Sequence, residues 1–221
     1  MKKGVIIFFL FVLPIAAYLF FASGVNNFTT LPTITPKVNE LPNWESLSGE
    51  PVKLQDKITV LGFLGSNLYE LENKESLKNF VQLIYNKNKT FQDFQTIMVV
   101  PIDAKAKVDE LIYEFDWKRV GDISDWKFVF ASHQEIQNYY NTLGLIGNLD
   151  QYSGTSNVYI LDKSRNLRGR KGKNKKGTEE YKEGYSIISP AELKNEMEDD
   201  FKIILYEYRA AYKRNQPKRE I

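Results

Sequence analysis

Residues 58–64, with the sequence ITVLGFL, form the stretch that decides the fold. A short run of apolar and β-branched residues that ends at a glycine, here Gly65, predicts a buried β-strand. Downstream, Leu77, Phe80, Val81 and Ile84 recur at helical spacing. A second apolar run then extends from Phe94 to Val100, and Pro101 closes it. The order strand, helix, strand favours a sheet whose strands are joined by helical crossovers.

The same alternation continues to the end of the chain. Residues 108–115 have helical spacing, residues 126–130 form a strand pattern, and Ser132-His133-Gln134-Glu135 is typical of a capping box at a helix start. Residues 158–161 predict another strand. The last helix is expected to begin at Ser189-Pro190, where serine caps and proline fits the first turn. We therefore expect an α/β fold with a central sheet and helices on both faces.

The N-terminus carries a long apolar segment. Gly4 to Ala22 is 19 residues without a charge, which is long enough to span a bilayer as a helix. Lys2 and Lys3 precede it, so the positive-inside rule places the rest of the chain on the outer side of the cytoplasmic membrane, the periplasmic side. The alternative is a cleaved signal peptide with Ala22-Ser23-Gly24 as its cleavage site, although its apolar core would be unusually long.

These patterns divide the chain into four parts. We expect a transmembrane anchor at 1–24, an extended linker at 25–52 that is rich in Asn, Thr and Pro, a folded domain at 53–208, and a basic tail at 209–221.

Composition excludes several classes of function. The chain has no cysteine, so it has no disulfide and performs no thiol chemistry. Apart from Lys2 and Lys3, its 28 basic residues balance its 28 acidic residues, which gives no reason to expect a nucleic-acid partner. Its single histidine is His133.

Four blocks of sequence resemble the Sco/SenC family of membrane-anchored, thioredoxin-fold proteins linked to copper delivery during cytochrome c oxidase assembly. The blocks are ITVLGFLGSN at 58–67, IMVVPIDAKAKVDEL at 97–111, WKFVFASHQEIQNYYNTLG at 126–144 and SNVYILDKSRNLRGR at 156–170. The resemblance lies in order and spacing more than in identity. It implies a thioredoxin-like fold with a mixed central sheet, preceded by one transmembrane helix.

The metal-binding residues of that family do not carry over. Its two cysteines would fall near Asn67 and Leu71, and its histidine would fall near Gly154. Copper(I) requires soft thiolate, thioether or imidazole ligands, which these residues do not supply. We therefore expect no metal site, no cofactor and no catalytic residue of the family's kind, and we interpret Asn67, Leu71 and Gly154 as a degenerate site.

Two other features remain open. His133 is interpreted as an exposed residue near a helix N-terminus, while a divergent enzyme would use non-thiol groups near Asn67, Asp103 and His133. Eight cations lie within 163–176, and they form either a docking loop for an acidic protein or anionic lipid, or a solvated loop. These cations are Lys163, Arg165, Arg168, Arg170, Lys171, Lys173, Lys175 and Lys176.

The sequence thus predicts a single-pass membrane protein whose outward-facing, Sco-like domain binds another membrane or envelope protein. The resemblance points to an accessory role in the assembly of a respiratory complex, cytochrome c oxidase, or another envelope complex. A structural subunit of an envelope complex and a divergent thioredoxin-fold enzyme are the alternatives.

Overall fold

The computed structural model describes residue 8 and residues 10–15, 30–67, 71–117, 120–173 and 177–215. The strand predicted at 58–64 is confirmed as β3 (Ile58–Leu64), which lies at the centre of the sheet. On one side it pairs in parallel with β4 (Phe94–Pro101), which pairs in parallel with β5 (Lys127–Ala131). On the other side it pairs antiparallel with β6 (Gly154–Leu161). The sheet is therefore mixed, as expected.

Short strands complete the sheet, whose order is β1-β7-β6-β3-β4-β5-β2, with β10 also paired to β6. A separate two-stranded hairpin, β8–β9, leaves the sheet after β7. The bounds of these strands are β1 (Thr33–Thr35), β2 (Glu45–Ser46), β7 (Leu167–Arg168), β8 (Arg170–Lys173), β9 (Glu179–Lys182) and β10 (Tyr185–Ser186).

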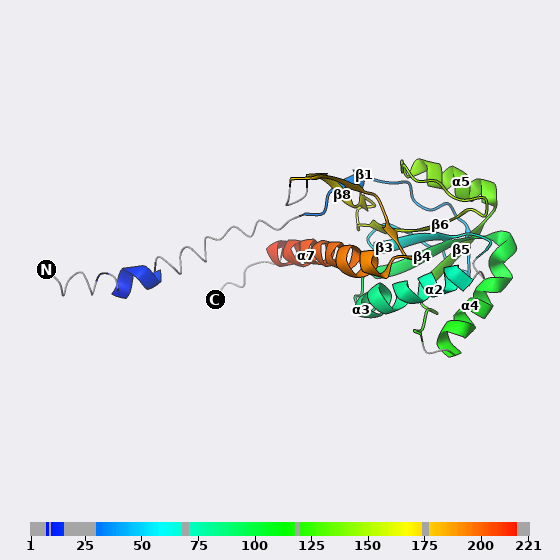
Figure 1. Cartoon of the computed structure of the whole chain (residues 1–221), viewed down its shortest axis with the longest axis horizontal. Helices are drawn as coiled ribbons and strands as arrows, with labels where there is room; N and C mark the ends of the chain where they lie inside the picture. The colour runs from blue at the N-terminus through cyan, green and yellow to red at the C-terminus, as the bar shows by residue number, and fades with distance from the viewer. Residues whose placement is uncertain are drawn as a thin grey trace.

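Helices cover both faces of the sheet (Figure 1). α2 (Leu71–Phe80) continues through the π-helical turn η1 (Val81–Tyr85) into α3 (Asn86–Asn88). The 3-10 turn η2 (Ile102–Ala104) opens α4 (Lys105–Trp117), and α5 (His133–Thr142) begins with the predicted capping box. The C-terminal helix consists of α6 (Pro190–Glu192), the π-helical turn η3 (Leu193–Met197) and α7 (Glu198–Asn215), and Ser189 caps it as predicted.

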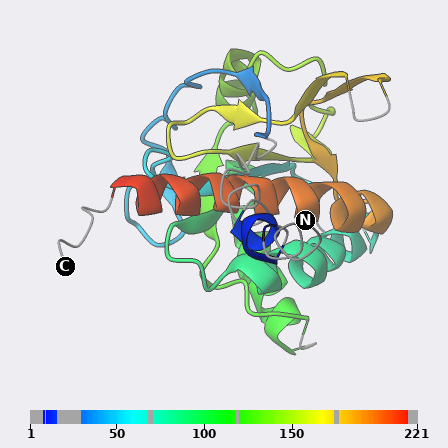
Figure 2. The same ribbon diagram turned by 90° about the vertical axis from the view of Figure 1, so that its left-hand side faces the viewer.

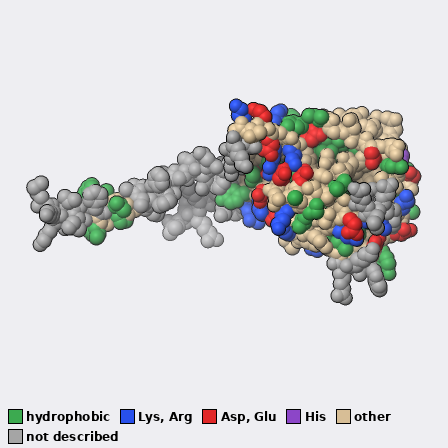
Figure 3. Space-filling model, viewed as in Figure 1, with side chains coloured by type: hydrophobic (Ala, Val, Ile, Leu, Met, Phe, Trp, Pro, Cys, Tyr) green, Lys and Arg blue, Asp and Glu red, His purple; other side chains and the backbone are tan. Residues whose placement is uncertain are grey.

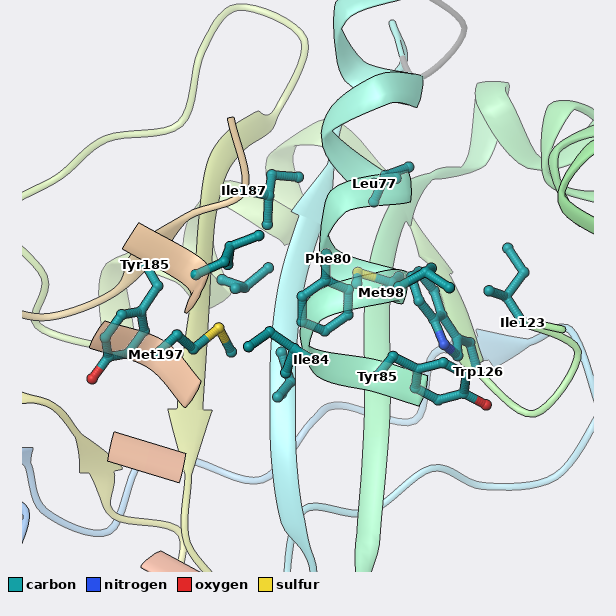
Figure 4. Close-up of a cluster of buried hydrophobic side chains, with 14 of the residues drawn as sticks. Leu77, Phe80, Ile84, Tyr85, Met98, Ile123, Trp126, Tyr185, Ile187 and Met197 are labelled. Atoms are coloured by element: carbon teal, nitrogen blue, oxygen red, sulfur yellow. The ribbon is translucent and has the colours of Figure 1, made fainter. Parts of the chain in front are cut away.

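Alternate side chains of the strands form two hydrophobic clusters, because successive residues of a strand point to opposite faces. Val60 and Met98 belong to the cluster beneath α2, α4 and the C-terminal helix, where Phe80, Trp126 and Met197 also lie (Figure 4). Residues of the opposite face, among them Leu61, Val99 and Tyr159, pack against α5. The sheet is therefore covered by a hydrophobic cluster on each of its two faces.

Residues 31–52, most of the segment expected to form a linker, pack against the domain. They supply β1 and β2, which pair with β7 and β5 at the two ends of the sheet. Val38 and Leu41 are buried against the α5 face, and the Val38 amide donates to the Arg165 carbonyl at 2.9 Å. Residues 31–52 are therefore part of the folded domain, which includes about twenty more residues than the sequence suggests.

The expected transmembrane anchor at 1–24 falls largely outside the described residues. Within the ranges that are described, no helix has both the length and the apolar character needed to span a bilayer.

Candidate functional site

The candidate site lies at the carboxyl edge of the sheet. The parallel strands β3, β4 and β5 all end at this edge, and β6 begins there because it runs antiparallel to β3. Asn67 follows β3, Asp103 follows β4, and His133 follows β5. The topology therefore places these three residues at one edge of the sheet, and it brings two of them, Asp103 and His133, into contact.

His133 is held between two partners. Its Nδ1 lies 2.7 Å from Ser153 Oγ, and its Nε2 lies 3.4 Å from Asp103 Oδ1. The side chains of His133 and Asp103 are 45% and 58% exposed, whereas Ser153 is buried. A buried hydroxyl thus fixes the orientation of an exposed imidazole, and the imidazole presents its second nitrogen to a carboxylate at the surface.

This serine, histidine and aspartate do not form a hydrolytic triad. A nucleophilic serine must be accessible, with free hydrogen-bond donors beside it to stabilise an oxyanion. Ser153 is only 6% exposed, and its φ of 61° places it in the left-handed region as part of a tight turn. The amides of Tyr152 and Gly154 both donate to Asp150 Oδ1 at 2.8 Å, and the Ser153 amide donates to the Asp150 carbonyl. Ser153 therefore positions His133 and is not a nucleophile.

Ser153 is the residue of this site that sequence reasoning missed. Its only local signal is Asp150 three positions before it, whose carboxylate closes the turn that presents the serine. The contact with His133 spans twenty residues, and no helical or strand periodicity indicates it.

The position assigned to the family's histidine is closed by backbone. Gly154 pairs with Leu64 at the end of β3. A Cβ added to Gly154 would lie 3.1 Å from both Cα and N of Gly65, and one added to Gly65 would lie 3.0 Å from Gly154 Cα. Because the neighbouring atoms are backbone, they cannot move aside as a side chain would. This approach leaves no room for an imidazole at position 154 without a shift of the strand end.

The loop that would carry the thiols is fixed by other contacts. The Ser66 amide donates to the Tyr152 carbonyl at 3.0 Å, and Lys107 Nζ donates to the Ser66 carbonyl at 3.1 Å. Asn67 lies in the turn after β3, and Leu71 begins α2. The chain contains no cysteine, and no group of three His, Asp or Glu side chains among the described residues could hold a metal ion.

A pocket lies next to this edge but does not include the His133 pair. It has an empty volume of about 300 Å³ that includes open solvent, and Leu64, Leu77, Ile187, Thr155 and Ser156 are among the residues that line it. Asp103 and His133 are brought together at the edge of the sheet, outside the lining of this pocket.

The eight cations of 163–176 separate into distinct environments. Lys163 forms an ion pair with Asp93. Arg168 is buried and contacts Asp162 and Glu207. Arg165 lies in the turn between β6 and β7, and Lys175 and Lys176 lie outside the described residues.

The hairpin accounts for the other three cations. Arg170 contacts Asp200 and Glu180. Lys171 and Lys173 are exposed, and within the described part of the chain neither forms an ion pair. The stretch thus combines internal structural contacts with a small exposed basic surface.

The ion pairs also set the electrostatics of the buried arginine. Burial alone would lower the pKa of Arg168, but hydrogen bonds to Asp162 and the charge of Glu207 raise that pKa above its usual value. Arg168 is therefore a permanent cation inside the fold, with two carboxylates arranged around it.

Comparisons with known proteins find likeness at the level of structure. No protein-family model matches the chain, and no curated protein matches it. Among solved structures, a SCO1/SenC family lipoprotein from Bacillus anthracis str. Ames is 15% identical, with a TM-score of 0.55, and the match covers 79% of this chain and 99% of that one.

Two further structures are similar. BsSco, a member of the Sco family of cytochrome c oxidase assembly proteins, is 12% identical with a TM-score of 0.55, over 79% of this chain and 98% of that one. A putative protein disulfide isomerase from Bacteroides thetaiotaomicron is 12% identical with a TM-score of 0.50, over 83% and 99%. The likeness to Sco/SenC structures expected from the sequence is thereby confirmed. The chain has an α/β, thioredoxin-like fold similar to that of Sco/SenC proteins, but it lacks their thiols.

Proposed function

We propose that this chain is a membrane-anchored, outward-facing domain that acts by binding another envelope protein through the carboxyl edge of its Sco-like sheet. The observation that supports this proposal is that the position of the Sco/SenC metal site carries no ligand residues in this chain and is partly filled by backbone. Gly65 and Gly154 meet backbone to backbone at the position where the family's histidine would have to be accommodated.

The closed site argues against the chemistry of thiol-dependent relatives. Thiol–disulfide exchange requires a thiolate, and copper(I) requires soft ligands. With no cysteine in the sequence and Asn67 in the turn after β3, the edge can bind a partner but cannot exchange electrons with it by a thiol route.

The surface around the closed site has the character of a small contact surface. Ile102 is 47% exposed and Tyr152 is 39% exposed, and they lie next to Asp103 and Ser153 in the chain. Apolar and aromatic side chains surrounded by polar groups are typical of protein interfaces. The hydrogen bond between Ser153 and His133 fixes the imidazole before a partner binds, so binding costs little side-chain conformational entropy at this residue.

The class of partner is suggested by the structural neighbours. One is a SCO1/SenC family lipoprotein, and another belongs to a family of cytochrome c oxidase assembly proteins. We therefore propose an accessory role in the assembly of a respiratory complex, with cytochrome c oxidase as the first candidate. A structural subunit of another envelope complex is the alternative, and the identity of the partner separates the two.

Site-specific photo-crosslinking in native membranes tests this proposal. A photo-reactive residue replaces Ile102 in the full chain, and a matched control carries it at Lys202, whose side chain is 61% exposed on α7. We expect one dominant crosslinked protein from position 102, absent from position 202 and lost when Tyr152→Ser is added. Identical products from both positions, or none from position 102, would refute binding at this edge.

A further inference from the structure

The β8–β9 hairpin has two chemically different faces. Opposite residues of an antiparallel pair lie on the same face, and the register pairs Arg170 with Lys182 and Lys171 with Tyr181. The inner face is partly buried, and there Arg170 contacts Asp200, while Lys182 Nζ lies 2.7 Å from Glu196 Oε2. These ion pairs attach the hairpin to the C-terminal helix.

The outer face is turned to solvent, and two of its four side chains are lysines. It carries Lys171, Lys173 and Tyr181, the last 45% exposed, together with one carboxylate, Glu179, opposite Lys173. Lysine and arginine side chains, interspersed with Asp and Glu, lie at the end of the domain where this hairpin lies (Figure 3). Lysines beside an exposed tyrosine favour a membrane–water interface, where the aromatic ring sits at the level of the headgroups.

The hairpin lies next to the point where the chain enters the domain. The Gly169 amide, at the base of the hairpin, donates to the Pro32 carbonyl at 3.0 Å. The Leu31 amide donates to Glu207 Oε1 at 2.9 Å, and Arg168 Nε donates to the Leu31 carbonyl at 2.9 Å. Contacts on both sides of Leu31 therefore fix the entry point against β7 and α7.

The views agree with this placement. Figure 1 shows the hairpin and the C-terminal end of α7 on one side of the domain, and α4 and α5 on the other. Seen from the first side, α7 crosses the end of the domain with the hairpin beside it (Figure 2). The outer face of the hairpin and the His133 edge thus belong to different ends of the molecule.

The length of the N-terminal chain limits the distance from this end to a bilayer. Eight residues, 23–30, separate the end of the apolar segment from Leu31. Even fully extended they span at most about 29 Å. If residues 4–22 are the anchor, as the proposed function assumes, the hairpin end of the domain faces the membrane surface, while the His133 edge faces away from it.

We propose that the outer face of the β8–β9 hairpin binds anionic lipid headgroups and so orients the domain on its membrane. Anionic lipids attract lysines that come within a Debye length, which is about 8 Å at physiological salt. Each lysine at the surface changes the ratio of bound to free hairpin by about fivefold. This inference rests on the proposed anchoring, and its test separates the two.

The test uses the full chain reconstituted in vesicles that contain no other protein. Because the sequence lacks cysteine, Thr178→Cys introduces a unique thiol beside the outer face for a fluorescent probe. A probe at Gln134→Cys, in the first turn of α5, is the control. Quenching by nitroxide-labelled headgroups is measured in phosphatidylcholine vesicles with and without 30% phosphatidylglycerol. Flotation with the neutral vesicles reports on the anchor alone.

We expect phosphatidylglycerol to increase quenching at position 178 severalfold and to leave position 134 unchanged. The increase should disappear in 1 M salt and in the Lys171→Gln/Lys173→Gln double variant. It should persist in a Lys105→Gln/Lys107→Gln variant, which removes the same charge from α4. Quenching that is independent of lipid charge while the protein still floats would overturn the hairpin proposal, and would leave an acidic protein as its partner. Failure to float with neutral vesicles would refute the anchor instead.

Discussion

Replacement of Arg168 by alanine provides the most direct test of how the entry of the chain is fixed. Its guanidinium contacts Asp162 Oδ2 at 2.9 Å, both carboxylate oxygens of Glu207 at 2.9–3.0 Å, and the Leu31 carbonyl. The side chain is 9% exposed. Arg168→Ala would therefore leave two carboxylates and one carbonyl near the surface of the core without their cation.

The expected loss of stability depends on which hydrogen bonds Asp162 and Glu207 retain without the guanidinium. Removing one member of a buried ion pair costs about 3–5 kcal/mol. Asp162 retains bonds from the Ser164 and Asn166 amides, and the Glu207 side chain is 21% exposed and can recruit water. Both effects reduce the loss, so we expect the free energy of unfolding to fall by about 2–4 kcal/mol.

The assay is urea unfolding of the full chain in mild detergent, followed by tryptophan fluorescence. Arg168→Lys should fall between wild type and alanine, because an ammonium is a point charge and cannot hold all three partners of a planar guanidinium. Lys202→Ala is the control. It removes an exposed cation that contacts Glu198, so the free energy of unfolding should stay close to that of the wild type. Equal stabilities for Arg168→Ala and Lys202→Ala would refute the reasoning.

Two further predictions concern the closed site and the base of the basic stretch. Gly154→Ala should lower the free energy of unfolding by about 1–3 kcal/mol, because the added Cβ meets the Gly65 backbone. The control is Gly147→Ala, whose Cβ meets only the ends of side chains and should cost less than about 1 kcal/mol. Equal losses for the two variants in urea unfolding would contradict this prediction. A hydrogen bond from Lys163 holds the pKa of Asp93 below its usual value, so its contribution is present above about pH 4 and is lost as the pH falls through the folded-state pKa. Asp93→Asn should therefore cost at most about 1 kcal/mol at pH 7, because the carboxylate is 36% exposed, and this cost should shrink as the pH falls below about 4. A pH-independent loss would exclude this linkage.

The main elements of this fold could be predicted because their signals are local. The apolar runs at 58–64 and 94–100 became β3 and β4, and the capping box at Ser132 and the serine cap at Ser189 mark helix starts. Each of these features depends on residues within a few positions of one another. The absence of thiol chemistry is likewise a property of composition alone.

The candidate site could be predicted only in part. The family resemblance singles out Asp103, and His133 stands out as the only imidazole, but nothing in the sequence indicates the buried partner of His133. Ser153 precedes β6 in an unremarkable polar loop, and its role depends on how the antiparallel strand returns to the carboxyl edge. Strand order is a property of the whole sheet, and no segment of sequence specifies it alone.

The basic stretch shows most clearly what only the tertiary structure decided. In sequence, Arg168 and Lys171 are equivalent members of a flexible, charged run. In the fold, Arg168 binds Leu31 and Glu207, which lie 137 and 39 positions away, whereas Lys171 remains in solvent. The sequence by itself determined which segments are strands and helices and which chemistry is absent, because periodicity, caps and composition act locally. The tertiary structure alone decided which charges are internal and which are available to a partner, because ion pairs form between segments that only folding brings together.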